Sequence, residues 1–132
     1  MIHATQAEPP FRTEIDAAGH PLVADEGPHL GGADAGPGPF ELVVSGLAAC
    51  TLITLRMYAQ RKAWVGFSVS AELRHRTEDG RHFIDRQVRV TGAPDAAGLD
   101  RLRDIVERTP VTLALKPGFE IVTTLAVAAT AT

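Results

Sequence analysis

The sequence has one cysteine, no excess of basic residues and no apolar run of membrane-spanning length. Its 132 residues include 13 Lys and Arg against 16 Asp and Glu, which gives no basic field of the kind that binds nucleic acid. A single cysteine, Cys50, excludes an intrachain disulfide and the usual multi-cysteine zinc sites. The apolar core of the longest hydrophobic stretch is roughly 14 residues, short of the roughly 20 that a membrane span needs. We therefore expect no nucleic-acid partner and no membrane association.

Sequence motifs of several enzyme classes are absent as well. The glycine-rich stretch 31–36 has no GxGxxG pattern and no GK[ST] after it, and Ser45 lacks the preceding glycine of a nucleophile elbow. The five histidines show no spacing that would indicate a metal site, and we expect no cofactor. Residues 1–6 lack the charged start and apolar run of a signal peptide. These absences predict a soluble, cytoplasmic protein and argue against hydrolase, nucleotide-dependent and metal-dependent functions.

The chain is organised around an apolar segment at 41–59, which predicts a helix that is hydrophobic on every side. A helix of that kind is expected to be buried. A turn at Gly36-Pro37-Gly38-Pro39 precedes it, and Glu41 suits the positive end of the helix dipole. One sheet and one further helix cannot cover all sides of this helix in so small a domain. We therefore predict a homodimer with the helix near the interface.

The remaining segments predict a single α+β domain spanning residues 1–132, with a mainly antiparallel sheet. Alternating apolar and polar residues indicate the strands, and glycine, proline and aspartate mark the turns. The expected strands are 2–6, 11–16, 21–24, 67–74, the return strand after Asp79-Gly80, and 119–127. The expected later helices begin at an Asp95 N-cap and at Thr109-Pro110, and the second runs to Leu115.

Cys50 is the candidate for chemistry, and its thiol is either a reactive nucleophile or a small apolar filler. A reactive thiol needs a cation or a hydrogen-bond donor to stabilise the thiolate, and no charged residue lies within one helical turn of it. Arg12 and Arg86 are the candidate cations, although each could be an ordinary ion-pairing arginine. Arg86 shares the apolar face of its strand and must reach an anion or solvent. Glu41 either orients such an arginine or interacts only with the helix dipole.

Five segments of the sequence resemble the OsmC/Ohr family, the osmotically inducible and organic-hydroperoxide-resistance proteins. The order of elements fits over nearly the whole chain, and the resemblance is most specific from Gly31 to Lys62. The segments are Asp25-Glu26, Leu30-Gly31-Gly32, Gly36-Pro37, Pro39-Phe40-Glu41-Leu42 and the run from Ala49 to Ala59. The resemblance implies an OsmC-like fold with a buried central helix. It also implies an intertwined homodimer whose two active sites lie near the subunit interface.

The resemblance further implies a catalytic cycle. In active members a cysteine on the central helix is oxidised by a hydroperoxide to sulfenic acid, and a second cysteine then forms a disulfide with it. An arginine and a glutamate keep the first cysteine as thiolate, and lipoyl groups or small thiols reduce the pair. Cys50 matches the first cysteine, and Arg12 matches the arginine by strand order. Glu41 lies one residue after the family's glutamate position, which Phe40 occupies here.

The second cysteine of the family is replaced in this chain. The family pattern Cys-Pro-Val corresponds to Thr109-Pro110-Val111, so Thr109 stands at the resolving position. Threonine can cap a helix as cysteine does, but it cannot form a disulfide. The chain therefore resembles an OsmC-like branch that lacks the second cysteine, and the two-cysteine cycle cannot operate in it.

Two functions of different classes follow. The first is a peroxidase-like enzyme of oxidative-stress defence, in which Cys50 reduces an organic hydroperoxide and an external thiol, or the Cys50 of another molecule, resolves the sulfenic acid. The second is a non-catalytic OsmC-fold dimer that binds a small apolar ligand, with Cys50 as a filler or a ligand-contacting thiol. The retention of Cys50 favours the first. A guanidinium within hydrogen-bond reach of the sulfur would support it further.

Overall fold

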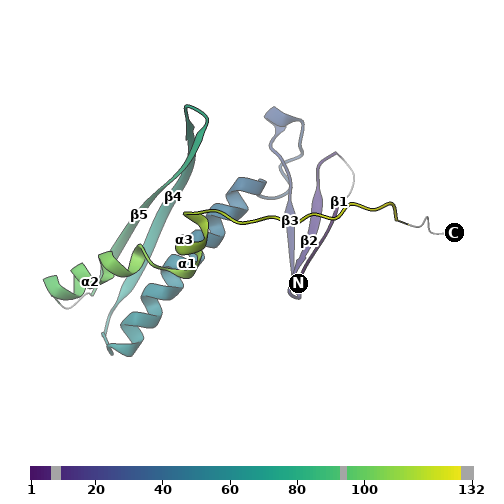
Figure 1. Cartoon of the computed structure of the whole chain (residues 1–132). Coiled ribbons are helices and arrows are strands. Elements are labelled where there is room, and N and C mark those ends of the chain that lie inside the picture. The colour runs from purple at the N-terminus through teal and green to yellow at the C-terminus, as the bar shows by residue number, and fades with distance from the viewer. Residues whose placement is uncertain (7–9, 93–94, 129–132) are drawn as a thin grey trace.

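The computed structural model describes residues 1–6, 10–92 and 95–128 and has the expected α+β composition (Figure 1). The strands are antiparallel and form two separate sheets, β1-β2-β3 and β4-β5. In chain order the elements are β1 (Ile2–Gln6), β2 (Thr13–Ala17), β3 (His20–Ala24), the short 3-10 helix η1 (Pro28–Leu30), α1 (Pro39–Arg61), β4 (Ser68–Glu78), β5 (Arg81–Thr91), α2 (Ala96–Val106) and α3 (Pro110–Leu115).

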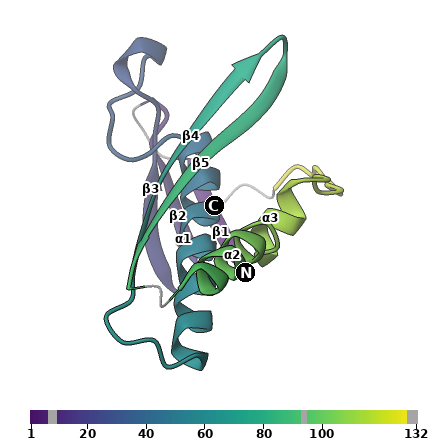
Figure 2. The same ribbon diagram turned by 90° about the vertical axis from the view of Figure 1, so that its left-hand side faces the viewer.

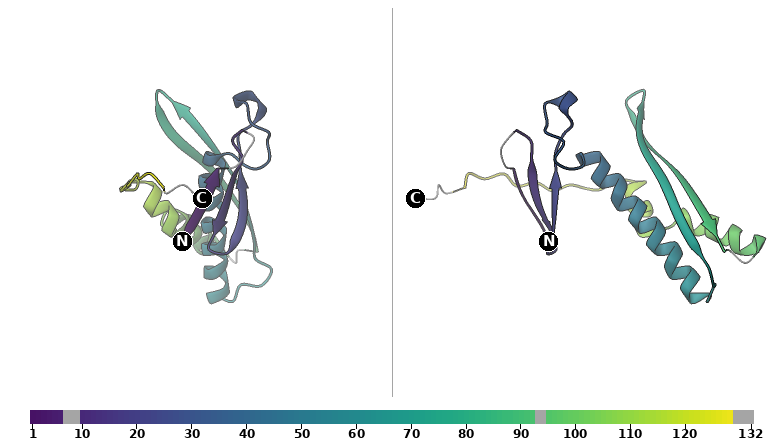
Figure 3. Two further views of the ribbon diagram at one scale, coloured as in Figure 1. Left: turned by 90° about the vertical axis from the view of Figure 1, so that its right-hand side faces the viewer. Right: turned by 180° about the vertical axis from the view of Figure 1, so that it is seen from behind.

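The N-terminal sheet confirms the three strands expected before the glycine-rich connection. β2 is its central strand and pairs antiparallel with both β1 and β3. The turn between β2 and β3 lies at Ala18-Gly19, where the Gly19 N–H donates to the Asp16 carboxylate at 2.7 Å. Figures 1 and 3 show this sheet beside the rest of the chain, not packed on α1.

The connection between β3 and α1 follows a defined path, as its composition indicates. A methyl group added at Gly36 would lie 2.1 Å from the Val23 carbonyl oxygen, so only glycine fits there. Asp25 is buried at the start of the connection and accepts backbone hydrogen bonds from Glu26 at 2.7 Å and Ala35 at 3.1 Å. The bond from Ala35, followed by that from Glu26, lowers the pKa of Asp25 below its ordinary value of 3.8.

Helix α1 confirms the expected central helix, but only one of its sides is buried in the single chain. The buried side, which packs mainly on β4, consists of Leu47, Thr51, Leu55 and Ala59. Large apolar residues about half exposed remain on α1, among them Val43 near its start and Ile53 and Met57 on the side opposite the buried one. One chain therefore covers α1 only in part, as expected for so small a domain. Together the β4-β5 hairpin and the two short helices leave Ile53 and Met57 uncovered.

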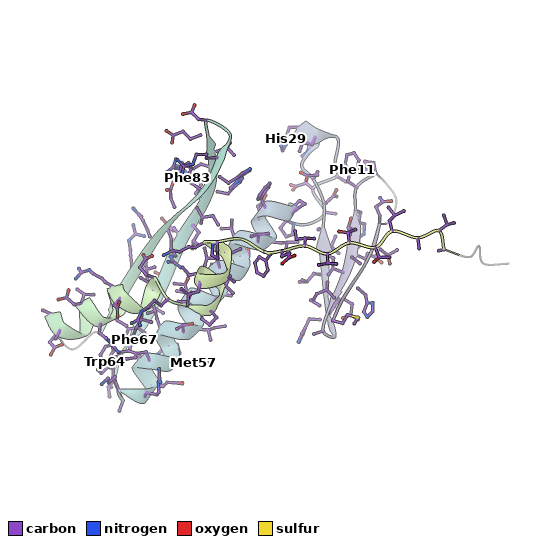
Figure 4. All side chains as sticks on the ribbon, viewed as in Figure 1. Phe11, His29, Met57, Trp64, Phe67 and Phe83 are labelled. Carbon is purple, nitrogen blue, oxygen red and sulfur yellow. The ribbon has the colours of Figure 1, made fainter. Side chains whose placement is uncertain are left out.

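The core lies where the second half of α1 meets the base of the β4-β5 hairpin and α2. Its fully buried members are Leu55, Ala59, Phe67 and Leu102, and Trp64 packs against them. Figure 4 shows Trp64 and Phe67 together at this end of the molecule, with Met57 on the other side of α1. By length and composition α1 is also apolar enough to cross a membrane, but core helices of soluble proteins meet the same criterion.

The β4-β5 hairpin turns at Asp79-Gly80, as expected, and both turn residues have positive φ angles of 51° and 75°. Ile84, Val88 and Val90 share one face of β5 and are partly buried, and Arg86 stands among them. The hairpin covers one side of α1, while α2 and α3 lie along another (Figure 2). The face of β5 that carries Arg86 is thereby placed between the helices.

The two later helices begin where the sequence predicts. The Asp95 carboxylate caps α2 by accepting the Gly98 N–H at 2.7 Å. Thr109 is the N-cap residue of α3 and Pro110 is its first helical residue. The turn between α2 and α3 is therefore short, and it places the start of α3 against the middle of α1.

The final strand expected at 119–127 is absent. These residues run past α3 without forming a strand, and they cross the direction of β1–β3 instead of following an edge (Figures 1 and 3). Ladder hydrogen bonds need an edge that runs alongside the segment, and no such edge of the same chain is described. The large apolar side chains of residues 119–127 therefore remain 66–97% exposed, among them Phe119, Ile121, Leu125 and Val127.

Candidate functional site

Cys50 lies midway along α1, at the boundary between the buried and exposed sides of the helix, and is partly exposed. Its Sγ accepts a hydrogen bond from the Val111 N–H at 3.4 Å and lies 4.0 Å from Thr54 Oγ1. Val111 is the second residue of α3, so its N–H has no partner within that helix and is free to donate to the sulfur. The thiol therefore has polar neighbours on two elements, an N–H donor on α3 and a hydroxyl on α1, and is not enclosed by hydrocarbon.

Arg86 fixes the three elements around the cysteine to one another. Its Nη1 donates to Thr51 Oγ1 at 2.9 Å and to Thr112 Oγ1 at 3.0 Å, and its Nη2 donates to the Val106 carbonyl at 2.8 Å. Thr51 follows Cys50 in α1, and Thr112 follows Val111 in α3. One guanidinium thus joins β5 to α1, α2 and α3 next to the cysteine.

Arg86 is expected to reach an anion or solvent; it is partly exposed, but it makes its hydrogen bonds within the chain. All three acceptors are neutral oxygens, and Thr51 and Thr112 are buried. Thr51 Oγ1 also donates to the Leu47 carbonyl at 2.8 Å, so its hydroxyl uses both donor and acceptor capacity. The positive charge of Arg86 also contributes slightly to the lowered pKa of Glu107, which the hydrogen bond from Lys116 dominates.

Thr109 occupies the position at which the family resemblance places a resolving cysteine. Its side chain is fully buried, and its Oγ1 lies 2.6 Å from Thr112 Oγ1. The backbone of Thr109 begins α3, but its hydroxyl caps no N–H of that helix. The threonine therefore extends the hydrogen-bond network of Arg86 through Thr112. This arrangement replaces a sulfur with a bonded hydroxyl and leaves no free group at the position.

The single chain brings neither Arg12 nor Glu41 to the sulfur. Arg12 lies just before β2 and pairs with Glu14 at 3.6 Å, on the N-terminal sheet. Glu41 is exposed in the first turn of α1, nine residues before Cys50. Nine residues correspond to two and a half turns, which puts Glu41 on the opposite face of α1 and about 14 Å along its axis. Within the described part of the chain no arginine hydrogen-bonds to Cys50 Sγ.

The sequence reasoning missed the hydroxyl network of Thr51 and Thr112. A signal for Thr51 exists, because it stands four residues after Leu47 and four before Leu55 on the face of α1 that is otherwise apolar. A hydroxyl on a buried face needs a partner, and Arg86 is the inward-facing donor that also needed one. No feature of the sequence indicates that the Val111 N–H donates to Cys50, because this contact depends on how α3 packs on α1.

A family model described as OsmC-like protein matches residues 31–124. The chain belongs to the OsmC-like family. The matched range contains α1 with Cys50, Arg86 on β5 and the whole of α3, so the site described above lies inside the part that defines an OsmC-like protein. No curated protein matches the chain.

Solved structures of OsmC-like proteins share the fold at low sequence identity. The OsmC-like protein of Mycoplasma pneumoniae is 22% identical with a TM-score of 0.67, and the alignment covers 88% of this chain and 86% of that one. An organic hydroperoxide resistance protein OsmC from Legionella pneumophila is 19% identical with a TM-score of 0.61, covering 88% of both chains. A putative osmotic stress induced and detoxification response protein from Psychrobacter arcticus 273-4 is 14% identical with a TM-score of 0.68, and the alignment covers 85% of both chains. At these identities the likeness establishes the OsmC-like fold.

Proposed function

We propose that this OsmC-like protein is a one-cysteine, thiol-dependent reductase of organic hydroperoxides that acts in oxidative-stress defence. The Cys50 thiolate attacks the O–O bond of the hydroperoxide ROOH. The S–O bond forms, the O–O bond breaks, and the alkoxide leaves as ROH after taking a proton, so that sulfur loses two electrons and becomes sulfenic acid. An external thiol then returns the sulfur to its reduced state, because Thr109 supplies none.

The surroundings of Cys50 are the observation that carries this proposal. Cys50 is a partly exposed residue, and its sulfur accepts the Val111 N–H, the kind of donor that supports a reactive thiol. Family membership adds to this, and so does the organic hydroperoxide resistance protein OsmC among the structures that share the fold. A single free cysteine also suits a soluble protein of the reducing cytoplasm.

The active form in this proposal is an intertwined homodimer. Three features of the single chain support it: the exposed apolar side of α1, the exposed apolar segment 119–127, and the N-terminal sheet that stands apart from α1. A second copy covering α1 would bury Val43, Ile53 and Met57, and apolar surface of this kind is typical of subunit interfaces. Arg12 and Glu41 would then approach Cys50 from the other copy, and so take the place near the cysteine that the resemblance gives to an arginine and a glutamate.

Oxidation of the purified protein by cumene hydroperoxide tests the reductase. Cys50 should gain the mass of one oxygen, and 2-mercaptoethanol should reverse the gain while cumyl alcohol accumulates. A Cys50→Ser variant should produce no alcohol, because serine cannot cycle through a sulfenic acid. A Cys50 thiol that remains unoxidised after prolonged exposure, in a protein that labels normally with iodoacetamide once unfolded, contradicts the proposal.

One observation favours a second candidate, the non-catalytic dimer that binds a small apolar ligand. A groove of about 620 Å³ lies between β5 and α3, and its lining includes the apolar side chains of Leu47, Ile84 and Leu115. The absence of a guanidinium at the sulfur in the described chain also fits a non-catalytic role. If this candidate is correct, an apolar fluorescent probe should bind equally well to the Cys50→Ser variant, and the peroxide should leave the wild-type thiol intact.

A further inference from the structure

A groove of about 400 Å³ runs along the second half of α1, on the side of α2. Tyr58 and Ile105 are its partly buried apolar members, and Thr54 is the lining residue nearest to Cys50 along the helix. The Thr54 hydroxyl lies 4.0 Å from the Cys50 sulfur, so the groove begins beside the reactive thiol. Its remaining lining residues are three exposed cations, Arg61, Lys62 and Arg101.

The groove is positively charged, although the chain carries a net charge of −3. The Arg61 guanidinium and the Lys62 ammonium lie 6.0 and 5.7 Å from the centre of the Tyr58 ring, which holds both beside the groove. Neither forms an ion pair with any described residue. Arg101 pairs with Asp104 at 3.7 Å, but Asp104 is shared with Arg108. The groove therefore retains positive charge that an anion could neutralise.

We propose that this groove binds the carboxylate end of the external thiol that reduces Cys50, an inference that rests on the proposed reductase function. The ligand is an elongated monothiol of about peptide size with at least one free carboxylate. Its thiol reaches Cys50 past Thr54, while its carboxylate meets Arg61 and Arg101. Arginine is suited to this contact because its planar fork matches a carboxylate.

The dimensions of the groove set the size of the thiol. Arg61 is eleven residues after Cys50, about 16 Å along the helix axis. Its side chain inclines toward the N-terminal end of α1 and shortens that span. Three extended peptide residues reach about 10 Å, which covers much of the remainder. A small thiol such as 2-mercaptoethanol would react with the sulfur without using the cations.

Thr109 explains why the reducing thiol must come from outside the chain. Thr109 follows α2 and is fully buried, with its hydroxyl engaged by Thr112, so no sulfur of the chain can attack from there. The groove along α2 begins beside Thr54 and so gives an external thiol a route to the sulfur. The incoming thiol attacks the sulfenic acid, the S–S bond forms and water leaves. A second molecule of the thiol then attacks the mixed disulfide, which releases the Cys50 thiol and the disulfide of the reductant.

Thiol–disulfide exchange tests the groove without using the peroxidase reaction. The resting Cys50 thiolate attacks either glutathione disulfide, which carries carboxylates, or hydroxyethyl disulfide, which is uncharged, and mass spectrometry follows the mixed disulfide. The Arg61→Gln/Arg101→Gln double variant should react about three- to tenfold more slowly with glutathione disulfide at low ionic strength, as expected for losing two exposed charge contacts. Its rate with hydroxyethyl disulfide should be unchanged, and high salt should abolish the difference.

The matched control is Arg103→Gln, which removes the same charge from α2 at an exposed residue that does not line the groove. It should leave both rates unchanged. Four results would each contradict binding of the thiol's carboxylate in this groove. They are equal slowing of the double variant with the two disulfides, no slowing with either, slowing by Arg103→Gln as large as that of the double variant, and no reaction of Cys50 with either reagent. Failure of cumene hydroperoxide to oxidise Cys50, with the charge-dependent exchange intact, would instead overturn the reductase and leave the anionic thiol site standing.

Discussion

Replacing Arg86 with methionine should destabilise the protein by about 2–3 kcal/mol. The guanidinium makes three hydrogen bonds, to Thr51, Thr112 and the Val106 carbonyl. A hydrogen bond to a charged group contributes about 1.5–3 kcal/mol. Part of that sum is offset, because methionine removes a desolvated charge and fills similar space. The two hydroxyls also keep their other partners, so the Val106 carbonyl is the acceptor that loses most.

Urea unfolding at one fixed protein concentration measures this change, since the stability of a dimer depends on concentration. The matched control is Arg89→Met on the same strand, whose exposed side chain pairs with Glu72 at 3.6 Å and should contribute less than about 0.5 kcal/mol. Iodoacetamide labelling of Cys50 gives a second readout, because loosening α3 should alter access to the sulfur. If Arg86→Met unfolds within about 0.5 kcal/mol of the wild type, the network does not hold these elements together.

Three further predictions concern other parts of the chain. Thr109→Cys should form an intramolecular disulfide with Cys50 on peroxide treatment, seen as the loss of two hydrogens in the intact mass and of both free thiols. Ending the chain at Gly118 should shift the protein from dimer to monomer in sedimentation equilibrium, and an unchanged mass would exclude a role of 119–127 in assembly. The lowered pKa of Asp25 means that its contribution to stability is present above pH 3.8 and is lost as the pH falls through its folded-state pKa, so urea titrations should show a flatter acid dependence for Asp25→Asn than for wild type.

The local elements of the fold could be predicted because their signals are local. Asp79-Gly80 alone specifies the hairpin turn, and the Asp95 carboxylate with Gly98 specifies the start of α2. The prediction of a strand at 119–127 depended on alternation, which indicates an extended chain that buries one face. Alternation says nothing of which strand edge lies alongside, and no edge of the same chain follows this segment. The prediction of a strand at 119–127 is wrong for the single chain for that reason.

Two residues of the candidate site, Cys50 and Arg86, could be predicted from the sequence, but the hydrogen bonds between them and the rest of the site could not. Cys50 was found as the one cysteine on an apolar helix, and Arg86 as an inward-facing cation that needed partners. The identity of those partners could not be predicted, because Thr51 and Thr112 belong to different helices, α1 and α3, that are far apart in the sequence. Arg86 was predicted to reach an anion or solvent; it is partly exposed, and neutral oxygens of the chain accept its hydrogen bonds. Such acceptors leave no charge pattern in the sequence.

The features that the single chain leaves incomplete all concern surfaces that a second copy would reach. The exposed side of α1 is apolar, the segment 119–127 has no strand edge beside it, and Arg12 lies on a sheet that does not pack on α1. A sequence records the side chains for such contacts but not which chain supplies the opposite surface. If the proposed homodimer provides that surface, the missing cation at Cys50 and the missing partner of 119–127 have one cause. Activation of the thiol and assembly of the dimer would then be the same event.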